Sequence, residues 1–155
     1  MGPRVWLAGE GDVESVSALL AEFRDHMGRD TPTDAEIRAT VDVLSADPHT
    51  EFLLAAPDAE EAAAGVCQLR YRLTVWTGAD DCCLEDLFVA RAARHAGLGR
   101  ALVSAALERA EARGCRRIDL DVSEENGNAL ALYREMGFNT GSKPLGRNLY
   151  AMRRL

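Results

Sequence analysis

One joint in the chain restricts the possible folds most strongly: a strand-like run that ends in a glycine-containing turn and continues as a helix. Residues 82–89 (C-C-L-E-D-L-F-V) have the apolar character of a buried strand, and an alanine- and leucine-rich stretch follows Gly99. Between them Arg94, Gly97 and Gly99 form R-x-x-G-x-G. Glycine lets backbone N–H groups approach a ligand, and the first turn of a helix adds unpaired N–H donors and partial positive charge. The joint therefore predicts an anion site, and phosphate is the usual anion.

The charges around this turn strengthen that prediction. No acidic residue occurs between Val89 and Glu108, although the chain of 155 residues has a formal net charge of -7. The turn instead contains four basic residues, Arg91, Arg94, His95 and Arg100. Two common nucleotide motifs do not fit: there is no Gly-x-x-x-x-Gly-Lys-Ser/Thr run, and Leu102 stands where a dinucleotide fingerprint needs Gly or Ala.

Size and composition predict a single domain, residues 1–155, in the cytoplasm. The chain is 47% hydrophobic and 28% charged, as expected for one soluble core, and no apolar run approaches the roughly 20 residues of a membrane span. Its first residues lack the apolar segment of a signal peptide. None of the four cysteines forms C-x-x-C, so we expect reduced thiols and no metal. The net acidic charge argues against a nucleic-acid partner.

The first half of the chain predicts two helices followed by an antiparallel meander. Residues 5–8 form a strand, a helix runs from the N-cap Asp12 through Met27, and the T-D-A-E capping box opens a second helix over 34–44. Strands follow at 51–55 and 65–76, leading into the strand at 82–89.

The second half predicts a strand–helix–strand unit and a further helix. The helix after the glycines covers 98–113 and the next strand 116–122, so the two strands of the unit should be parallel neighbours. A loop at 124–128 precedes a helix over 129–136, and Phe138 begins a short strand. Residues 142–146 form a loop, and 148–153 form a last strand.

Two spaced motifs in this order resemble the GCN5-related N-acetyltransferase (GNAT) superfamily. The first is R-x-x-G-x-G after E-D-L-F-V, and the second is N-x-x-A-x-x-L-Y-x-x-x-G-F over residues 126–138. The resemblance implies an α/β (α+β) single-domain fold: a mixed, mostly antiparallel sheet of six or seven strands, splayed between strands 4 and 5, with about four flanking helices. It also implies acetyl transfer from acetyl-CoA to an amine, and a homodimer is common in the superfamily.

The resemblance also implies cofactor-binding roles for individual residues. Backbone groups of Leu87, Phe88 and Val89 would bind pantetheine and polarise the thioester carbonyl. The turn residues would hold the pyrophosphate, namely Arg94, His95, Ala96, Gly97, Leu98, Gly99 and Arg100. Asn126 and Ala129 would contact the cofactor arm.

Two side chains are candidates for proton transfer. An alkylammonium with a pKa near 10.4 must lose a proton before it attacks, so a base, or a water chain that leads to one, is needed. Glu85 on the strand before the turn is the candidate base, and Tyr133 is the acid that the resemblance implies for the thiolate. The other interpretations are a strand-face carboxylate paired with arginine for Glu85 and a core tyrosine for Tyr133. Asp86 points to the opposite face from Glu85 unless a bulge intervenes, and such a bulge is frequent in this superfamily.

The acceptor is less restricted by the sequence. The pattern L-E-D-L-F-V looks most like the spermidine/spermine (diamine) acetyltransferases, which favours a small-molecule amine such as a polyamine. Asp80, Asp81, Glu85 and Asp86 are acids that can hold a polycation, and Tyr71 and Trp76 either line an amine pocket or pack the sheet. Other acceptors are an amino acid, an aminoglycoside, or a protein lysine or N-terminus. A regulatory module that binds acyl-CoA without turnover is the alternative from another class, and a ping-pong enzyme using Cys82 or Cys83 is a third hypothesis.

Overall fold

A computed structural model describes residues 2–140 and 149–155, which fall into two compact units. The first extends to Asp121 and contains all five strands: β1 (Arg4–Leu7), β2 (Thr50–Ala56), β3 (Gly65–Thr74), β4 (Ala79–Val89) and β5 (Ile118–Asp119). It also contains α1 (Val13–His26), α2 (Asp34–Ser45) and α3 (Leu98–Ala112). The second unit begins at Val122 and contains α4 (Gly127–Glu135). No helix of the described residues is long and apolar enough to cross a membrane.

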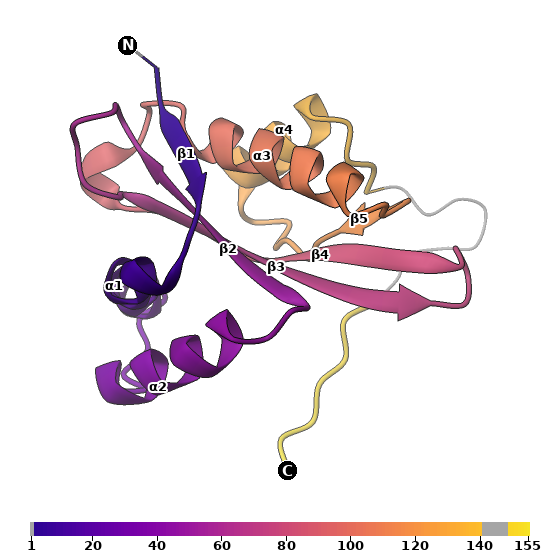
Figure 1. Cartoon of the computed structure of the whole chain (residues 1–155), viewed down its shortest axis with the longest axis horizontal. Helices are drawn as coiled ribbons and strands as arrows, with labels where there is room; N and C mark the ends of the chain where they lie inside the picture. Colours follow the sequence, from indigo (N-terminus) through magenta and orange to yellow (C-terminus); the bar gives the residue numbers. More distant parts are fainter. Residues whose placement is uncertain (1, 141–148) are drawn as a thin grey trace. The chain divides into compact units, whose positions relative to one another are not determined.

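The sheet has the order β1-β2-β3-β4-β5, and its ladders are antiparallel except for the parallel pair β4–β5 (Figure 1). The predicted meander and the parallel strand–helix–strand unit are therefore confirmed. The predicted capping box at the start of α2 is also present, because Thr33 Oγ1 accepts from Glu36 N at 3.2 Å and Glu36 accepts from Thr33 N at 2.8 Å.

The expected six or seven strands are too many, because the described residues form five. No strand begins at Phe138: its N–H donates to the Tyr133 carbonyl and that of Gly137 to the Arg134 carbonyl, a pattern that closes the end of α4. Residues 149–153 of the expected last strand are exposed and pair with no described strand. Asn148 and the expected loop at 142–146 lie outside the described residues.

Strand β5 is shorter than the expected 116–122, because it pairs with β4 only at Cys82–Ile118 and Cys83–Asp119. The reason lies in β4, which carries a β-bulge two residues further on. Leu69 of β3 faces Leu84, and its neighbour Gln68 faces Asp86, so Glu85 is an extra residue without a partner. A bulge bends and twists its strand, and beyond Cys83 no described residue extends the β5 ladder.

The bulge also reverses the alternation of side chains along β4. Leu84 lies opposite Leu69, on the face of Gly65, where an added Cβ would lie 3.1 Å from Leu102 of α3. Phe88 packs on the other face, where its ring stacks on Phe23 of α1 at 5.0 Å between centroids. In a regular strand residues 84, 86 and 88 share one face. Glu85 therefore allows Leu84 to pack under α3 while Asp86 and Phe88 face α1 and α2.

The first unit thus has two packed layers around its sheet, with α1 and α2 on one face and α3 on the other (Figure 1). The end of α3 is attached through Glu51 of β2, which accepts hydrogen bonds from Arg109 and from the hydroxyl of Tyr71. Burial opposes ionisation of Glu51, but these hydrogen bonds outweigh burial and hold its pKa below the ordinary value. The contact fixes α3, and with it the turn from which α3 starts.

Candidate active site

The turn between β4 and α3 has the backbone geometry of an anion site. His95 and Gly97 both adopt positive φ, +67° and +81°. Left-handed residues within a turn direct successive N–H groups into one concavity. Among the described residues, no backbone carbonyl accepts from the N–H groups of residues 95–99, and the helical ladder begins only when Ala101 donates to Gly97. The predicted pyrophosphate site therefore has the donors that such a group requires.

The side chains of the turn are arranged so that the backbone stays accessible. Arg94, His95 and Ala96 are exposed, whereas Leu98 is buried beneath the turn, 3.6 Å from the position of a Cβ on Gly65. Arg94 donates from Nε to the Val89 carbonyl at 3.3 Å, which ties the turn to the end of β4. The Leu98 side chain therefore packs into the core, and only its backbone N–H is available to a ligand.

Strand β4 reaches this turn with one edge that no described strand pairs. Leu87, Phe88 and Val89 pair with β3 on one side, while the β5 ladder on the other side ends at Cys83. Backbone groups on an open strand edge are available to an extended ligand. This geometry agrees with the pantetheine-binding role expected for these three residues.

The second unit carries the other expected site residues. Asn126 is the N-cap of α4: its Oδ1 accepts from Ala129 N at 3.2 Å, so this N–H is already used within the helix. Tyr133 is buried on α4, and its ring contacts Phe138 edge-on at 5.6 Å. The cofactor contacts of Asn126 and Ala129 and the acid role of Tyr133 stay predictions.

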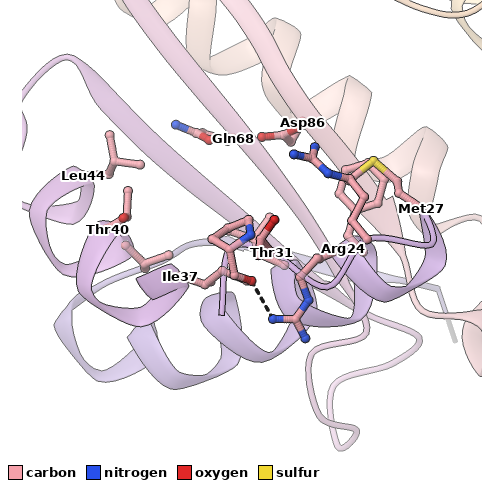
Figure 2. A pocket seen from close by; sticks show the side chains of 13 residues that line it. Arg24, Met27, Thr31, Ile37, Thr40, Leu44, Gln68 and Asp86 are labelled. Atoms are coloured by element: carbon pink, nitrogen blue, oxygen red, sulfur yellow. Dashed lines mark hydrogen bonds between the residues drawn. The ribbon is translucent and has the colours of Figure 1, made fainter. Parts of the chain in front are cut away.

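A cavity of about 230 Å³ lies on the α1/α2 face of the first unit, and we call it the acceptor pocket (Figure 2). In Figure 2, Gln68 and Asp86 come from the strands, Met27 from the end of α1, and Ile37, Thr40 and Leu44 from α2. Most of the wall is apolar, formed by Leu20, Phe23, Met27, Pro32, Ile37, Val41 and Leu44. Arg24, Arg29 and Thr31 complete the helix side.

Gln68 and Asp86 are the polar groups on the strand side of this pocket. They are cross-strand neighbours, Gln68 is buried and Asp86 half-buried. No hydrogen bond or ion pair of either side chain is formed with another described residue. Burial, with a smaller contribution from the charge of Glu85, raises the pKa of Asp86. Both side chains line the cavity, so their hydrogen-bonding groups are available to a ligand.

Glu85 lies outside the acceptor pocket. As the bulged residue it is exposed, and the Cys83 thiol lies 3.6 Å from its carboxylate. Among the described residues it forms no ion pair with an arginine, so the alternative interpretation of Glu85 gains no support. From the sequence alone, Asp86 is a weaker candidate than Glu85 for the base, because strict alternation puts it on the face opposite Glu85. The expectation of a bulge is the signal that points to it.

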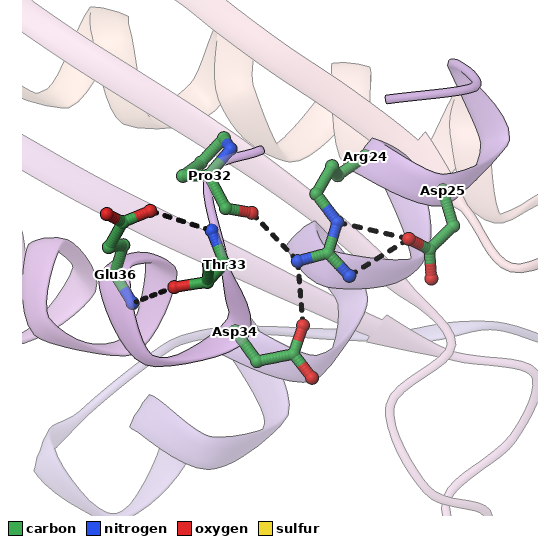
Figure 3. Close-up of polar contacts among 6 residues, drawn as sticks. All are labelled: Arg24, Asp25, Pro32, Thr33, Asp34 and Glu36. Carbon is green, nitrogen blue, oxygen red and sulfur yellow. Dashed lines mark hydrogen bonds and ion pairs between the residues drawn. The ribbon is translucent and has the colours of Figure 1, made fainter. Parts of the chain in front are cut away.

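A polar network holds the α1–α2 connection that forms one wall of the pocket (Figure 3). Arg24 donates to Asp25, to the Pro32 carbonyl at 2.8 Å, and to Asp34 at 2.7 Å. Two carboxylates thus neutralise the Arg24 guanidinium, which acts as a structural cation rather than a free ligand group. The capping box of Thr33 and Glu36 continues the network into α2.

Other residues suggested for the acceptor lie elsewhere. Asp81 is buried and paired with Arg117, at 2.8 Å from Nε, and Asp80 is at the start of β4. Trp76 is 85% exposed at the β3–β4 hairpin, and Tyr71 binds Glu51 on the α3 face. None of these four residues lines the acceptor pocket.

The cysteines do not have the character of nucleophiles. Burial raises the pKa of both Cys82 and Cys83 to about 12, and nearby carboxylates add to the shift at Cys83. A thiolate nucleophile needs the opposite shift. The thiol-based ping-pong hypothesis therefore has no support in this site.

Comparisons with known proteins identify solved structures and a family that this chain resembles. A crystal structure of a candidate acetyltransferase from Arthrobacter sp. FB24 is 28% identical, with a TM-score of 0.85, over 100% of this chain and 96% of that chain. A transcriptional regulator from Bacillus halodurans C-125 is 27% identical, with a TM-score of 0.77, over 95% of this chain and 99% of that chain. An aminoglycoside N-acetyltransferase in complex with CoA has the same fold at 19% identity, with a TM-score of 0.79, over 99% of this chain and 95% of that chain. The acetyltransferase (GNAT) family matches residues 16–138, which include β4, the glycine turn and Tyr133, and this chain therefore belongs to the acetyltransferase (GNAT) family.

Proposed function

We propose that this protein transfers the acetyl group of acetyl-CoA directly to the primary amine of a small molecule, within a ternary complex. The observation that carries this proposal is the half-buried, unpartnered carboxyl group of Asp86 in an apolar pocket. It precedes Leu87–Val89 in β4, whose open edge leads to the anion-binding turn. Acceptor and donor sites thus share one strand.

The donor side is supported by the backbone of the turn. The N–H groups of residues 95–99 bind the pyrophosphate, and the glycine at 97 holds the left-handed conformation that directs them. Bound acetyl-CoA supplies an activated thioester. The β4 backbone from Leu87 to Val89 orients its carbonyl, and donors fixed before reaction stabilise the charge that develops there.

In the proposed mechanism, the amine loses its proton in the acceptor pocket. An apolar pocket disfavours an ammonium relative to the free amine, and the raised pKa of Asp86 makes its carboxylate a better proton acceptor. Asp86 takes the proton first. Glu85, adjacent and exposed, passes it to solvent and so keeps a role as a base. Tyr133 is proposed to protonate the departing thiolate.

We also propose a domain organisation, an assembly, a compartment and an acceptor class. Residues 1–155 act as one acetyltransferase domain, and a homodimer is the expected assembly. The described cysteines are free, which supports a reducing compartment such as the cytoplasm. Sequence resemblance favours a polyamine acceptor; of the four acids suggested to hold it, only Asp86 lines the acceptor pocket.

The proposal is tested by thiol release from acetyl-CoA against a panel of polyamines, amino acids, aminoglycosides and lysine peptides. Turnover with at least one small amine is expected, with saturation of both substrates and intersecting initial-rate plots. Tight acetyl-CoA binding in calorimetry without turnover on any amine would instead favour the regulatory module.

A further inference from the structure

We infer that the acceptor is an amine that carries a carboxylate on a small apolar body, with Asp86 holding the amine and Arg29 the carboxylate. The inference rests on the proposed function, because it assigns the substrate class of the same pocket. The expected acceptor is then an amino acid in the broad sense rather than a polycation.

The size and walls of the pocket limit the body of the acceptor. Its volume of about 230 Å³ lies below the roughly 300–1,000 Å³ of common ligand pockets. A short chain or a single ring fills this volume, whereas a multi-ring amine would extend beyond the residues that line it. Apart from Asp86, the side chains that surround this space carry no negative charge. Each further ammonium group of a polyamine would lose its hydration against apolar walls without a counter-ion.

Arg29 is the cation that the pocket offers to a ligand. It lines the pocket two residues after Met27, and its side chain is exposed. Among the described residues no ion pair or hydrogen bond of its guanidinium is formed, whereas Arg24 beside it is neutralised by Asp25 and Asp34. The neighbouring Asp30 does not line the pocket. A guanidinium matches a carboxylate with two parallel hydrogen bonds, so Arg29 is suited to an anionic group.

The exposed end of β3 is positively charged, as is Arg29. Gln68, Arg70 and Arg72 share one face of the strand by alternation, because the bulge lies in β4 and leaves β3 regular. Both arginines are exposed, and neither forms an ion pair with a described residue. A second ammonium group would meet repulsion here, which disfavours diamines relative to amino acids.

The first test compares matched acceptors by CoA release. Each amino acid is paired with the amine that lacks only its carboxylate: L-phenylalanine with phenethylamine, and ω-amino acids with alkylamines and α,ω-diamines of equal length. We expect kcat/KM for the best amino acid to exceed that of its matched amine by about tenfold and to exceed that of the diamine by more.

The second test asks whether Arg29 causes the preference. Arg29→Met keeps the length of the side chain and removes its charge. Arg116→Met is the matched control, because it removes one exposed charge from a residue that does not line the pocket. Arg29→Met should raise KM for the amino acid about fivefold more than it raises KM for the matched amine. Arg116→Met should change neither. Calorimetric titration of the best amino acid in the presence of CoA should show the same loss of affinity in Arg29→Met.

The outcomes separate this inference from the proposed function. Turnover that is equal or faster with diamines, or a preference that survives Arg29→Met, overturns the inference and leaves the acetyltransferase proposal intact. Absence of turnover with every amine, while acetyl-CoA binds, overturns the proposed function itself. A preference for amino acids that disappears in Arg29→Met and persists in Arg116→Met supports both.

Discussion

Asp86→Asn should reduce activity and increase stability at the same time. The amide keeps the size of the carboxyl group but accepts no proton from the amine. Removal of a positioned general base typically costs about 10²–10⁴-fold in rate, or about 3–5 kcal/mol of transition-state stabilisation. We therefore expect kcat/KM for the acceptor to fall within that range, while the affinity for acetyl-CoA, measured by calorimetry, stays unchanged.

The sign of the stability effect follows from the raised pKa of Asp86. The folded protein holds a proton on this group more tightly than the unfolded chain, whose carboxyl has the ordinary pKa of 3.8. The wild-type free energy of unfolding therefore falls as the pH rises from that value through the raised pKa, and the loss is complete above it. The amide of the Asp86→Asn variant does not titrate and has no such loss. The variant should therefore gain stability at pH values above the raised pKa, and its advantage should vanish toward acid.

Urea denaturation at several pH values measures this difference, and initial rates across the same pH values measure the activity. A variant that turns over at the wild-type rate would remove Asp86 from the proton path. A variant that is less stable than wild type at neutral pH would show that the carboxyl has a stabilising partner, which contradicts the unpartnered geometry of the acceptor pocket.

Three further predictions address the other predicted groups. Tyr133→Phe should lower kcat at least about tenfold with unchanged acetyl-CoA affinity, and stopped-flow CoA release at wild-type rate would exclude the acid role. Glu85→Gln should cost less activity than Asp86→Asn and should move the acidic limb of the pH–rate profile to lower pH, because the charge of Glu85 helps to raise the pKa of Asp86, whereas an unshifted profile would show that Glu85 does not act on the proton path. Gly97→Ala should cost about 1–2 kcal/mol of stability, because alanine is strained at φ +81°, and should weaken acetyl-CoA binding. Gly114→Ala, at φ +78°, is the control: similar destabilisation is expected there, and an equal loss of acetyl-CoA affinity would show that the turn does not hold the ligand.

Local sequence signals predicted most of the first unit because each acts over a few residues. The capping box at Thr33 and Glu36 fixes the start of α2, and the glycine turn fixes the start of α3. Alternation of apolar residues predicted the meander, and the strand–helix–strand order predicted parallel β4 and β5. The strand count failed at Phe138, because the pattern of apolar residues does not reveal that its N–H closes the end of α4.

The glycine turn of the candidate site could be located from the sequence, and the acceptor pocket could not. The turn at 94–99 is contiguous in sequence, so its glycines and basic residues identify it. The acceptor pocket is assembled from α1, α2, β3 and β4, and no local pattern joins Arg29, Gln68 and Asp86. Asp86 reaches it through a single extra residue in β4, a feature of strand pairing that periodicity cannot locate.

Glu85, the extra residue of the bulge, shifts the alternation of side chains along β4 by one position. Before Glu85 the even positions pack beneath α3, and after it they face α1 and α2, where Asp86 lines the acceptor pocket. If Asp86 holds the amine as proposed, a substitution at residue 86 should change which amine is accepted without altering the layer that positions the turn, and a substitution at residue 84 should do the reverse. Deleting Glu85 leaves every neighbouring side chain on its present face, so the deletion isolates what the bend in the strand contributes. Acceptor choice and donor binding should therefore depend on different positions of one strand. A substitution in the acceptor pocket could then change the substrate without changing the affinity for CoA.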